Sequence, residues 1–525
     1  MHKRLYAVEG ILLVGVGLLT LYLALLMQNA GFLETAVHQS QTVLTAGYAQ
    51  GTIYDRHLRP LTNAETRHYA AAIPTPAAVS AILPHVQEIT PLHMGLRTGK
   101  PFLCEIDTDV IDCPGVQVLS VPGDAPGHLP GQHLLGYTLE NVGVTGLQND
   151  FDALLRRTPA PVQITYTVDA RGHALNGIPG VVSDAQSPNG SIVTTLDADI
   201  QALCEAQPLD KGAIVVMDVQ TGDILAMASF PAYDPDRLGE ALSDENAPLI
   251  NRCLCPYNVG SIFKLVTSAA AYEQHRTHFV TECTGKTEIS GQVFRCHDWR
   301  GHGVVDLTQA MIDSCNAYFV ELSTRLDPVE MRTTAQNFGF GTQIVLSKSI
   351  LSQSGTLPSA EDLQLPAEMA NFCFGQGKLT ATPLQVTQMT CGIANDGKMP
   401  IARLVLGETD GSTLPVSPAP RFARPIDRRE AAFLQALMIA AVNQNPHSKA
   451  VPETVFAAAK TSTAQTGRFD ASGTELCHGW ITGYFPIDKP RYAVTVLAED
   501  GGYGNDAAAP VFAALADGIM QRRPD

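Results

Sequence analysis

The run NVGSIFKLVT at residues 258–267 places Ser261 three residues before Lys264, among glycine and apolar side chains. A serine hydroxyl is a weak nucleophile near neutral pH and needs a base within hydrogen-bonding reach. Residues three apart share one face of a helix, so a helix that begins at Ser261 places the Lys264 amine beside the hydroxyl. Apolar surroundings favour the neutral amine that a base requires. The structural alternative is an N-cap serine followed by a lysine whose amine reaches water.

Two further polar pairs follow in the chain. DSCNAYF at residues 313–319 contains Ser314 and Asn316, a hydroxyl and a carboxamide that can relay a proton and hydrogen-bond an amide substrate. AKTSTAQT at residues 459–466 places Lys460 and Thr461 ahead of a strand-like run, where they can hold a substrate carboxylate. In order and type, these pairs match the Ser-x-x-Lys, Ser-x-Asn and Lys-Thr-Gly set of penicillin-binding proteins and β-lactamases.

The elements around these motifs predict an α+β domain. A hairpin is expected at residues 213–229, with Gly222 in its turn. Strands and helices with clear periodicity follow it: helices from Ser261, Leu307 and Thr382, a helix at 428–443, strands at 479–485 and 491–498, and a last helix at 508–521. Strands at both ends with helices between them indicate one antiparallel sheet, closed from both termini and flanked by helices.

The preceding region, residues 29–205, has a different pattern. Short strand-like runs at 51–62 and 161–172 alternate with turn signals and with a helical stretch at 149–157. This pattern predicts an irregular, elongated α+β domain. The composition changes near residue 211, so we place the second domain at residues 206–525.

The N-terminus predicts a membrane anchor. Gly10 to Met27 is an uncharged apolar run of 18 residues, about 27 Å as a helix, which is close to the thickness of a bilayer core. Lys3 and Arg4 precede it, so the positive-inside rule keeps the N-terminus in the cytoplasm and the rest of the chain outside. We therefore assign residues 1–28 to a cytoplasmic stub and anchor. The alternative, a cleaved signal peptide, has only a poor cleavage site at residues 28–36.

The charge composition limits the classes of partner that this protein can bind. The chain has 525 residues, 17% of them charged, and a formal net charge of −17. An acidic protein is a poor ligand for phosphate backbones, so we expect no nucleic acid partner.

Eleven cysteines are present. Cys104 and Cys113, and likewise Cys283 and Cys296, look like pairs that span hairpins and could form disulfides outside the membrane. A zinc site from Cys253, Cys255, Cys283, Cys296 and His297 is an alternative, but its spacings match no known finger. Disulfides or free thiols are favoured, and no metal is expected.

The three motifs and their surroundings resemble those of a class B penicillin-binding protein, a membrane-anchored D,D-transpeptidase of peptidoglycan synthesis. The resemblance runs nearly end to end. It is carried by IYDRHLRPLT (53–62), GVTGLQNDFDALL (143–155), VTTLDADIQ (193–201), AIVVMDVQTGDILAMASFPAYDP (213–235), GHGVVDLTQAMIDSCNAYF (301–319), FGFG (338–341), FGQGKLTATPLQV (374–386) and HGWITGYFPIDKPRYAVTV (478–496). It implies a transpeptidase domain with the penicillin-binding and β-lactamase fold, on a pedestal at residues 29–205.

The resemblance also implies residue roles. Ser261 would be the acylated nucleophile, Lys264 its base, and Ser314 the relay of a proton to the leaving D-alanine. Asn316, Lys460, Thr461 and Thr463 would bind the stem peptide. The backbone N–H groups of Ser261 and Thr463 would form the oxyanion hole. The implied partners are D-Ala-D-Ala donor and amine acceptor stem peptides, β-lactam antibiotics and a SEDS-type glycosyltransferase in the membrane, with no cofactor.

The chain departs from the family pattern at Gln148, which replaces the acid of a usual Gly-Leu-Glu stretch, and at three positions in or beside the motifs. Ser462 replaces the glycine of Lys-Thr-Gly, Ala459 stands where glycine is common, and Val259 replaces a usual proline. Alternate residues of a strand share a face, so Ser462 should project on the same side as Lys460. Its hydroxymethyl group would either crowd a ligand or add a hydrogen bond.

Two other functions share this fold. A β-lactamase is a poor match, because a secreted hydrolase needs neither residues 29–205 nor a retained anchor. A catalytically silent cell-wall scaffold or β-lactam sensor is supported only by Ser462. The presence of Ser261, Lys264, Ser314 and Asn316 argues against it, because a silent scaffold does not need all four.

Overall fold

The computed structural model describes residues 2–27, 40–124, 127–157, 160–175, 177–183 and 190–523. The alternative cleavage site at residues 28–36 lies outside these residues. The chain forms two compact units. The first contains Met1–Gly51, Asn63–Asp124 and Arg156–Asn189, and the second contains Thr52–Thr62, Ala125–Leu155 and Gly190–Asp525. Segments 52–62, 125–155 and 190–205 thus pack with the C-terminal part of the chain.

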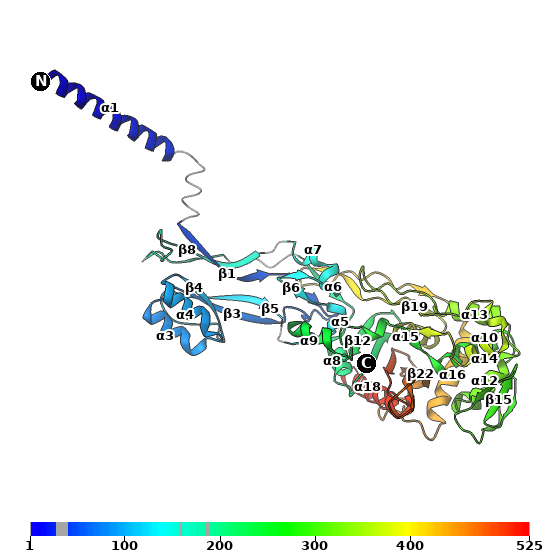
Figure 1. The fold of residues 1–525 in the computed structure, drawn as a ribbon. Coiled ribbons are helices and arrows are strands. Elements are labelled where there is room, and N and C mark those ends of the chain that lie inside the picture. Colours follow the sequence, from blue (N-terminus) through cyan, green and yellow to red (C-terminus); the bar gives the residue numbers. More distant parts are fainter. Residues whose placement is uncertain are drawn as a thin grey trace. The chain divides into compact units, whose positions relative to one another are not determined.

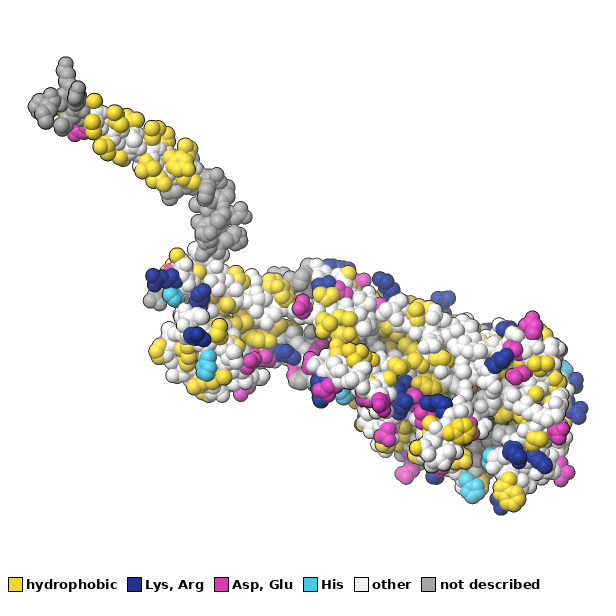
Figure 2. Space-filling view, in the orientation of Figure 1, with side chains coloured by type: hydrophobic (Ala, Val, Ile, Leu, Met, Phe, Trp, Pro, Cys, Tyr) yellow, Lys and Arg dark blue, Asp and Glu magenta, His cyan; other side chains and the backbone are white. Residues whose placement is uncertain are grey.

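Helix α1 spans His2–Met27. Its stretch Tyr6–Leu26 is long and apolar enough to cross a membrane, and none of it is buried against the protein. Hydrophobic side chains cover its visible face (Figure 2). Hydrocarbon is the solvent in which such a surface is stable.

The first unit is built on two three-stranded sheets. One contains β1 (Gln41–Ala49), β8 (Ala160–Thr167) and β9 (Val181–Ser183), and the other β3 (Glu65–Ala72), β4 (Phe102–Ile106) and β5 (Val116–Gly123). Apolar residues of β5 and β8, among them Val121 and Ile164, form one buried cluster between the two sheets. Helices α3 (Pro76–Ile82) and α4 (Ile89–Thr98) contribute to a second cluster on the other side of β3 and β4, and the short helix η1 (Leu83–His85) follows α3. The mixed α+β character expected for this part of the chain is confirmed.

The second unit contains a five-stranded antiparallel sheet in the order β12-β11-β24-β23-β22. The strands are β11 (Gly212–Asp218), β12 (Ile224–Phe230), β22 (Ala458–Phe469), β23 (Glu475–Phe485) and β24 (Tyr492–Ala498). Because β11 pairs with β24, the start and the end of the domain close one sheet, as the sequence predicted. Strand β22 lies at an edge.

Both faces of this sheet are covered. Ala213, Val215 and Met217 of β11 belong to one core, and the intervening Ile214 and Val216 belong to another. This alternation is the two-residue period of a strand that is buried on both sides. Helix α15 (Pro383–Ala394) packs on the first face, and α8 (Ala198–Glu205) and α18 (Ala509–Arg522) on the second.

The remaining elements of the second unit surround this sheet, and α10, α12, α13 and α14 lie together at one end (Figure 1). The helices are α5 (Gln132–Leu135), α6 (Gly146–Asp150), α7 (Asp152–Leu155), η2 (Pro235–Arg237), α9 (Leu238–Ser243), η3 (Arg252–Leu254), η4 (Gly260–Phe263), α10 (Lys264–Glu273), α11 (Leu307–Ile312), α12 (Asn316–Ser323), α13 (Pro328–Asn337), η5 (Asp362–Gln364), α14 (Pro366–Cys373), α16 (Arg428–Asn443) and α17 (Gly504–Ala507). The short strands are β2 (Ile53–Tyr54), β6 (Thr138–Leu139), β7 (Val142–Gly143), β10 (Ser191–Thr194), β13 (Tyr257–Asn258), β14 (Thr281–Cys283), β15 (Lys286–Ile289), β16 (Gln292–Arg295), β17 (Gly303–Val305), β18 (Thr380–Ala381), β19 (Met399–Pro400), β20 (Val405–Thr409) and β21 (Phe422–Ala423).

One helix of the sequence prediction is wrong. The apolar pattern from Leu307 predicted a single helix, but the structure has α11 and α12 with a break between them. Ser314, in the break, has φ +50°, a left-handed conformation that a continuous right-handed helix cannot contain.

All eleven cysteines lie in the described part of the chain and are free thiols. Neither of the two hairpin-spanning pairs suggested by the sequence forms a disulfide in this structure.

Candidate active site

Ser261 lies in the 3-10 turn η4, directly before α10, and η4 packs against the edge strand β22. Gly260 has φ +62°, and a Cβ added there would overlap the Ser462 hydroxyl. Its N–H donates to the carbonyl of Gly375 at 2.8 Å. The turn that carries Ser261 is thus held between β22 and the loop at Gly375. The close approach at Gly375, in the FGQG run, was not predicted from the sequence.

Lys264 is fully buried at the first position of α10. Its Nζ donates to the Ser314 carbonyl at 2.7 Å, to Asn316 Oδ1 at 2.8 Å and to Ser314 Oγ at 3.3 Å. The ring centroid of Phe319 is 5.3 Å away. Burial lowers the pKa of Lys264 to about 8, so a neutral amine is accessible near physiological pH.

Lys460 reaches the same hydroxyl from the sheet. Its Nζ donates to Ser314 Oγ at 3.0 Å and to the Thr461 carbonyl at 2.9 Å. Burial, and then the nearby charge of Lys264, lower the pKa of Lys460. One serine hydroxyl therefore lies between two buried amines, and the charge of Lys264 favours the neutral form of Lys460.

Ser462 also projects toward the helices from β22. Its hydroxyl donates to the Val259 carbonyl at 2.8 Å, and its side chain is 2% exposed. The sequence left open whether this serine would crowd a ligand or add a hydrogen bond, and in the structure it adds the hydrogen bond. That bond ties β22 to the residue before Gly260, at the base of the turn that carries Ser261.

Thr461 and Thr463 are half-buried on the alternate positions of β22. The hydroxyl of Thr463 accepts a hydrogen bond from the N–H of Gly504 at 3.2 Å. Because β22 is the edge strand, part of its backbone hydrogen-bonding groups point away from β23.

The structure thus brings Lys264, Ser314, Asn316 and Lys460 together at one point. Ser261 lies on the neighbouring turn. Its hydroxyl has no hydrogen-bond partner within the described ranges, so the expected Ser261–Lys264 hydrogen bond is not part of this arrangement. Catalytic hydrogen bonds are often absent in ligand-free structures and form only with the substrate bound.

The sequence profile of the Penicillin binding protein transpeptidase domain matches residues 212–517. The match covers more than half of the chain, and it contains both strands of the first hairpin and all the polar pairs of the site. The chain belongs to the penicillin-binding protein transpeptidase family.

Relatives within the family are peptidoglycan D,D-transpeptidases. PbpA of Mycolicibacterium smegmatis is 32% identical over 327 residues, which are 57% of this chain and 65% of PbpA. MrdA of Acinetobacter baumannii is 26% identical over 408 residues, 71% of this chain and 60% of MrdA. The chain therefore spans just under two thirds of the length of these curated relatives.

Solved structures share the fold. Penicillin-binding protein A of M. tuberculosis, in a ceftriaxone acyl-enzyme complex, has a TM-score of 0.65 at 21% identity, over 90% of this chain and 99% of that one. A chain of a peptidoglycan synthase complex that coordinates polymerization and crosslinking has a TM-score of 0.69 at 24% identity, over 98% of both chains.

Proposed function

We propose that this protein is a membrane-anchored serine D,D-transpeptidase that cross-links peptidoglycan stem peptides. The observation that carries the proposal is the meeting of Lys264 and Lys460 at the Ser314 hydroxyl, with Asn316 bound to the Lys264 amine, next to the turn of Ser261. A silent scaffold has no need to bury two amines whose pKa values are both lowered, because each burial costs free energy. Family membership and the D,D-transpeptidase relatives support the same conclusion.

In the first half-reaction, Ser261 Oγ attacks the carbonyl between the two D-alanines of a donor stem peptide. Neutral Lys264 takes the hydroxyl proton. The N–H groups of Ser261 and Thr463 stabilise the oxyanion. Collapse of the tetrahedral intermediate breaks the peptide bond. Ser314 passes its hydroxyl proton to the amine of the leaving D-alanine, and protonated Lys264 then returns a proton to Ser314. An acyl ester on Ser261 remains.

In the second half-reaction, an amine of a neighbouring strand attacks that ester. Lys264 accepts the proton of the incoming amine, and Ser261 leaves with a proton returned from Lys264. The product is a new amide cross-link. A β-lactam would acylate Ser261 by the same first step and block the second.

Lys460 and Thr461 would hold the terminal carboxylate of the donor, and Asn316 its backbone amide. In the free protein the pKa of Lys460 is lowered by burial and by Lys264. A bound carboxylate favours the protonated amine, so Lys460 gains its charge as the substrate arrives.

The anchor and the domains complete the proposal. Helix α1 is a retained single-pass anchor in the bacterial cytoplasmic membrane, with Lys3 and Arg4 inside and the catalytic residues outside the cell membrane. Residues 206–525 carry the catalytic residues, together with segments 52–62, 125–155 and 190–205 that pack in the same unit. The remaining part of residues 29–205 forms a pedestal. A SEDS-type glycosyltransferase binds the anchor and pedestal, which is in line with the fold shared with a peptidoglycan synthase complex. If pull-downs of the full-length protein in detergent never recover such a glycosyltransferase, the proposed partnership is excluded. The variant Glu9→Leu tests whether the polar residue of the anchor contributes to it.

Transpeptidation itself is tested with a D-Ala-terminated peptide thioester and a D-amino acid acceptor. The full-length protein in detergent should convert them into the amide product, detected by mass spectrometry. Rapid hydrolysis without transfer would point to a hydrolase. Absence of any reaction with either a thioester or a penicillin would point to the silent scaffold or sensor.

A further inference from the structure

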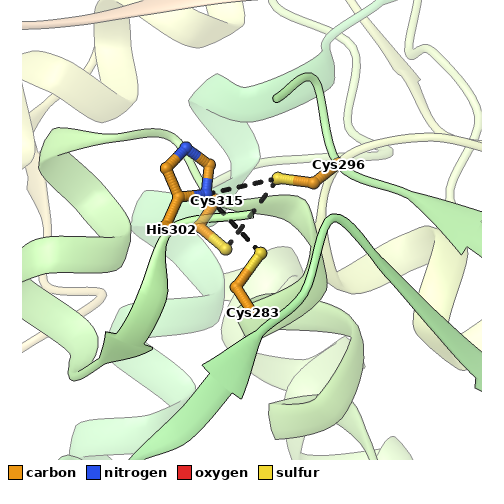
Figure 3. A group of neighbouring side chains, drawn as sticks. All are labelled: Cys283, Cys296, His302 and Cys315. Atoms are coloured by element: carbon orange, nitrogen blue, oxygen red, sulfur yellow. Dashed lines mark hydrogen bonds between the residues drawn. The ribbon is translucent and has the colours of Figure 1, made fainter. Parts of the chain in front are cut away.

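Three cysteines and one histidine converge in the second unit, beside the proposed active site. Cys283, Cys296, His302 and Cys315 each offer one ligand atom, and these four atoms all lie within 4.8 Å of one another. Figure 3 shows the three sulfurs and the imidazole pointing toward a common centre. The side chains of Cys283, Cys296 and Cys315 are 1%, 7% and 0% exposed.

Three of the six distances between these atoms match those of a tetrahedral zinc site. Bonds of about 2.3 Å to sulfur and about 2.0–2.1 Å to nitrogen place two sulfurs about 3.8 Å apart, and a sulfur and a nitrogen about 3.6 Å apart. Cys296 Sγ lies 3.9 Å from Cys315 Sγ. His302 Nδ1 lies 3.6 Å from both Cys283 Sγ and Cys296 Sγ. All three distances agree with a shared ion.

The backbone around the cluster is built to hold it. Cys283 ends β14, which pairs with β17 directly after His302, and Cys296 follows the hairpin of β15 and β16. Gly285 and Gly301 both have positive φ, and a Cβ on Gly301 would overlap the Cys283 carbonyl. The loop with His302 can therefore lie directly on the strand with Cys283.

The N-terminus of α12 faces the sulfurs. Cys315 is the N-cap residue of this helix. Asn316 is the first residue of α12, so the free backbone N–H groups of its first turn follow directly after Cys315. Helix N-termini stabilise anions, and a zinc-bound thiolate is one.

We propose that Cys283, Cys296, Cys315 and His302 bind one Zn²⁺ as a closed, structural Cys3His site. Binding would release three thiol protons, because cysteine binds zinc as thiolate. Four protein ligands leave no open position, so the ion takes no part in the acyl transfer. The zinc set considered from the sequence shares only Cys283 and Cys296 with this site, since Cys253 instead donates to the Ala228 carbonyl at 3.2 Å.

Because of its position, the zinc site would also affect the proposed active site. Cys315 separates Ser314 from Asn316, the two residues that hold the Lys264 amine. Zinc would therefore fix the left-handed turn at Ser314 in place, and Cys315 is a positioning residue. This consequence rests on the proposed function, whereas the metal site does not.

Zinc content tests the site without any substitution. The full-length protein, purified in detergent with a reductant and without chelators, should contain about one zinc per chain by plasma mass spectrometry. After removal of zinc, Co²⁺ should produce thiolate charge-transfer and tetrahedral d–d absorption. Less than about a tenth of a zinc per chain together with no Co²⁺ absorption would overturn the proposal. So would a Cys296–Cys315 disulfide peptide recovered in place of bound zinc.

Two histidines in the same loop provide a matched pair of variants. His302→Asn should lower zinc affinity at least tenfold, and His297→Asn, five residues earlier, should leave it unchanged. Loss of zinc from His297→Asn but not from His302→Asn would overturn the ligand assignment. Cys315→Ser should also lose zinc, with Cys113→Ser as its control.

The positioning consequence has a separate readout. At a temperature where far-UV circular dichroism shows that the metal-stripped protein stays folded, labelling by a fluorescent penicillin should be at least tenfold slower. Added ZnCl₂ should restore it. An unchanged acylation rate in folded, zinc-free protein would overturn the positioning role, and the zinc content would still report on the site itself.

Discussion

A single hydroxyl, that of Ser314, connects the two lysines of the proposed active site. Lys264 reaches it from a helix and Lys460 from the sheet, at 3.3 and 3.0 Å. Neither amine can be fully charged beside the other at this depth without a large electrostatic cost. The site therefore stores a neutral base, and a substrate carboxylate is the group that would let Lys460 take its charge.

Ser314→Ala tests the proton relay. The substitution removes the hydroxyl but keeps the carbonyl that binds Lys264, so the acylation rate should fall by about 10²–10⁴. The measurement is the second-order rate of labelling by a fluorescent penicillin. Ser268→Ala is the control, since it deletes a buried hydroxyl that donates to the Lys264 carbonyl at 2.7 Å. A rate for Ser314→Ala within twofold of that control would exclude a relay through Ser314.

Ser462→Ala tests the bond that replaces the glycine of the family motif. The buried Val259 carbonyl would lose its donor, which should lower the free energy of unfolding by about 1–3 kcal/mol. Denaturant unfolding of the full-length protein measures the loss. Ser354→Ala deletes an exposed hydroxyl whose bond to the Gly355 carbonyl is 3.2 Å, and it should change stability little. Equal effects of the two substitutions would show that the Ser462 bond contributes nothing special.

Much of the candidate site was predictable at this scale, because its residues lie in short motifs. Lys264, Ser314, Asn316 and Lys460 were all expected, and the structure brings them together. The cysteine–histidine cluster was not, because its members come from three loops, and their convergence depends on tertiary packing. Cys315 inside the Ser314–Asn316 motif was the available signal.

At the scale of elements, the break between α11 and α12 matters most for function. The apolar period of residues 307–326 continues through the break, so the sequence predicted one helix. Asp313 ends the first helix and Cys315 caps the second, with Ser314 at φ +50° between them. Local strain of this kind is typical of functional sites, where the surrounding contacts hold it.

A further prediction concerns Glu430, in the first turn of helix α16. Glu430 is buried, and one of its carboxylate oxygens has no partner within the described residues. Burial, and then the charges of Glu273 and Asp427, raise the pKa of Glu430 to about 8. Because the folded-state pKa lies above the unfolded value, the folded protein holds this proton more tightly. The contribution of Glu430 to the free energy of unfolding is therefore fully present below about pH 4.5 and is lost as the pH rises through about 8.

Glu430→Gln should remove this pH dependence. The variant should be more stable than the wild type at pH 8, by on the order of 3 kcal/mol, and close to it at pH 5. Urea unfolding at both pH values measures the difference. Glu330→Gln is a matched control, since Glu330 also follows an aspartate N-cap in the first turn of its helix but is exposed. A gain at pH 8 no larger than that of the control would contradict the burial argument.

At the scale of the whole molecule, the fold was predictable where long periodic elements determine it. The hairpin at 213–229, the helix at 428–443 and the final strands occur as expected, and β11 pairs with β24. The chain path before residue 205 was harder to predict. Segments 52–62 and 125–155 pack within the second unit, and short irregular segments carry no periodic signal for such long-range contacts.

The anchor is testable on the intact chain. In a bacterial host, the full-length protein should stay in the membrane after carbonate extraction and keep its complete N-terminus by mass spectrometry. Protease added to spheroplasts should digest it. Replacing Leu18 and Leu21 with arginine should reduce insertion, because each central arginine costs about 2.5–3.5 kcal/mol. A chain shortened near residue 36 and released from the membrane would identify a signal peptide instead.

The central claim is that Ser261 is an acylated nucleophile, and covalent labelling tests it most directly. The full-length protein in detergent is mixed with a fluorescent penicillin, and the adduct is located by peptide mass spectrometry. We predict a slowly decaying adduct on Ser261, absent from Ser261→Ala. An adduct that persists in Ser261→Ala, or no adduct while a peptide thioester also fails to react, would contradict the account.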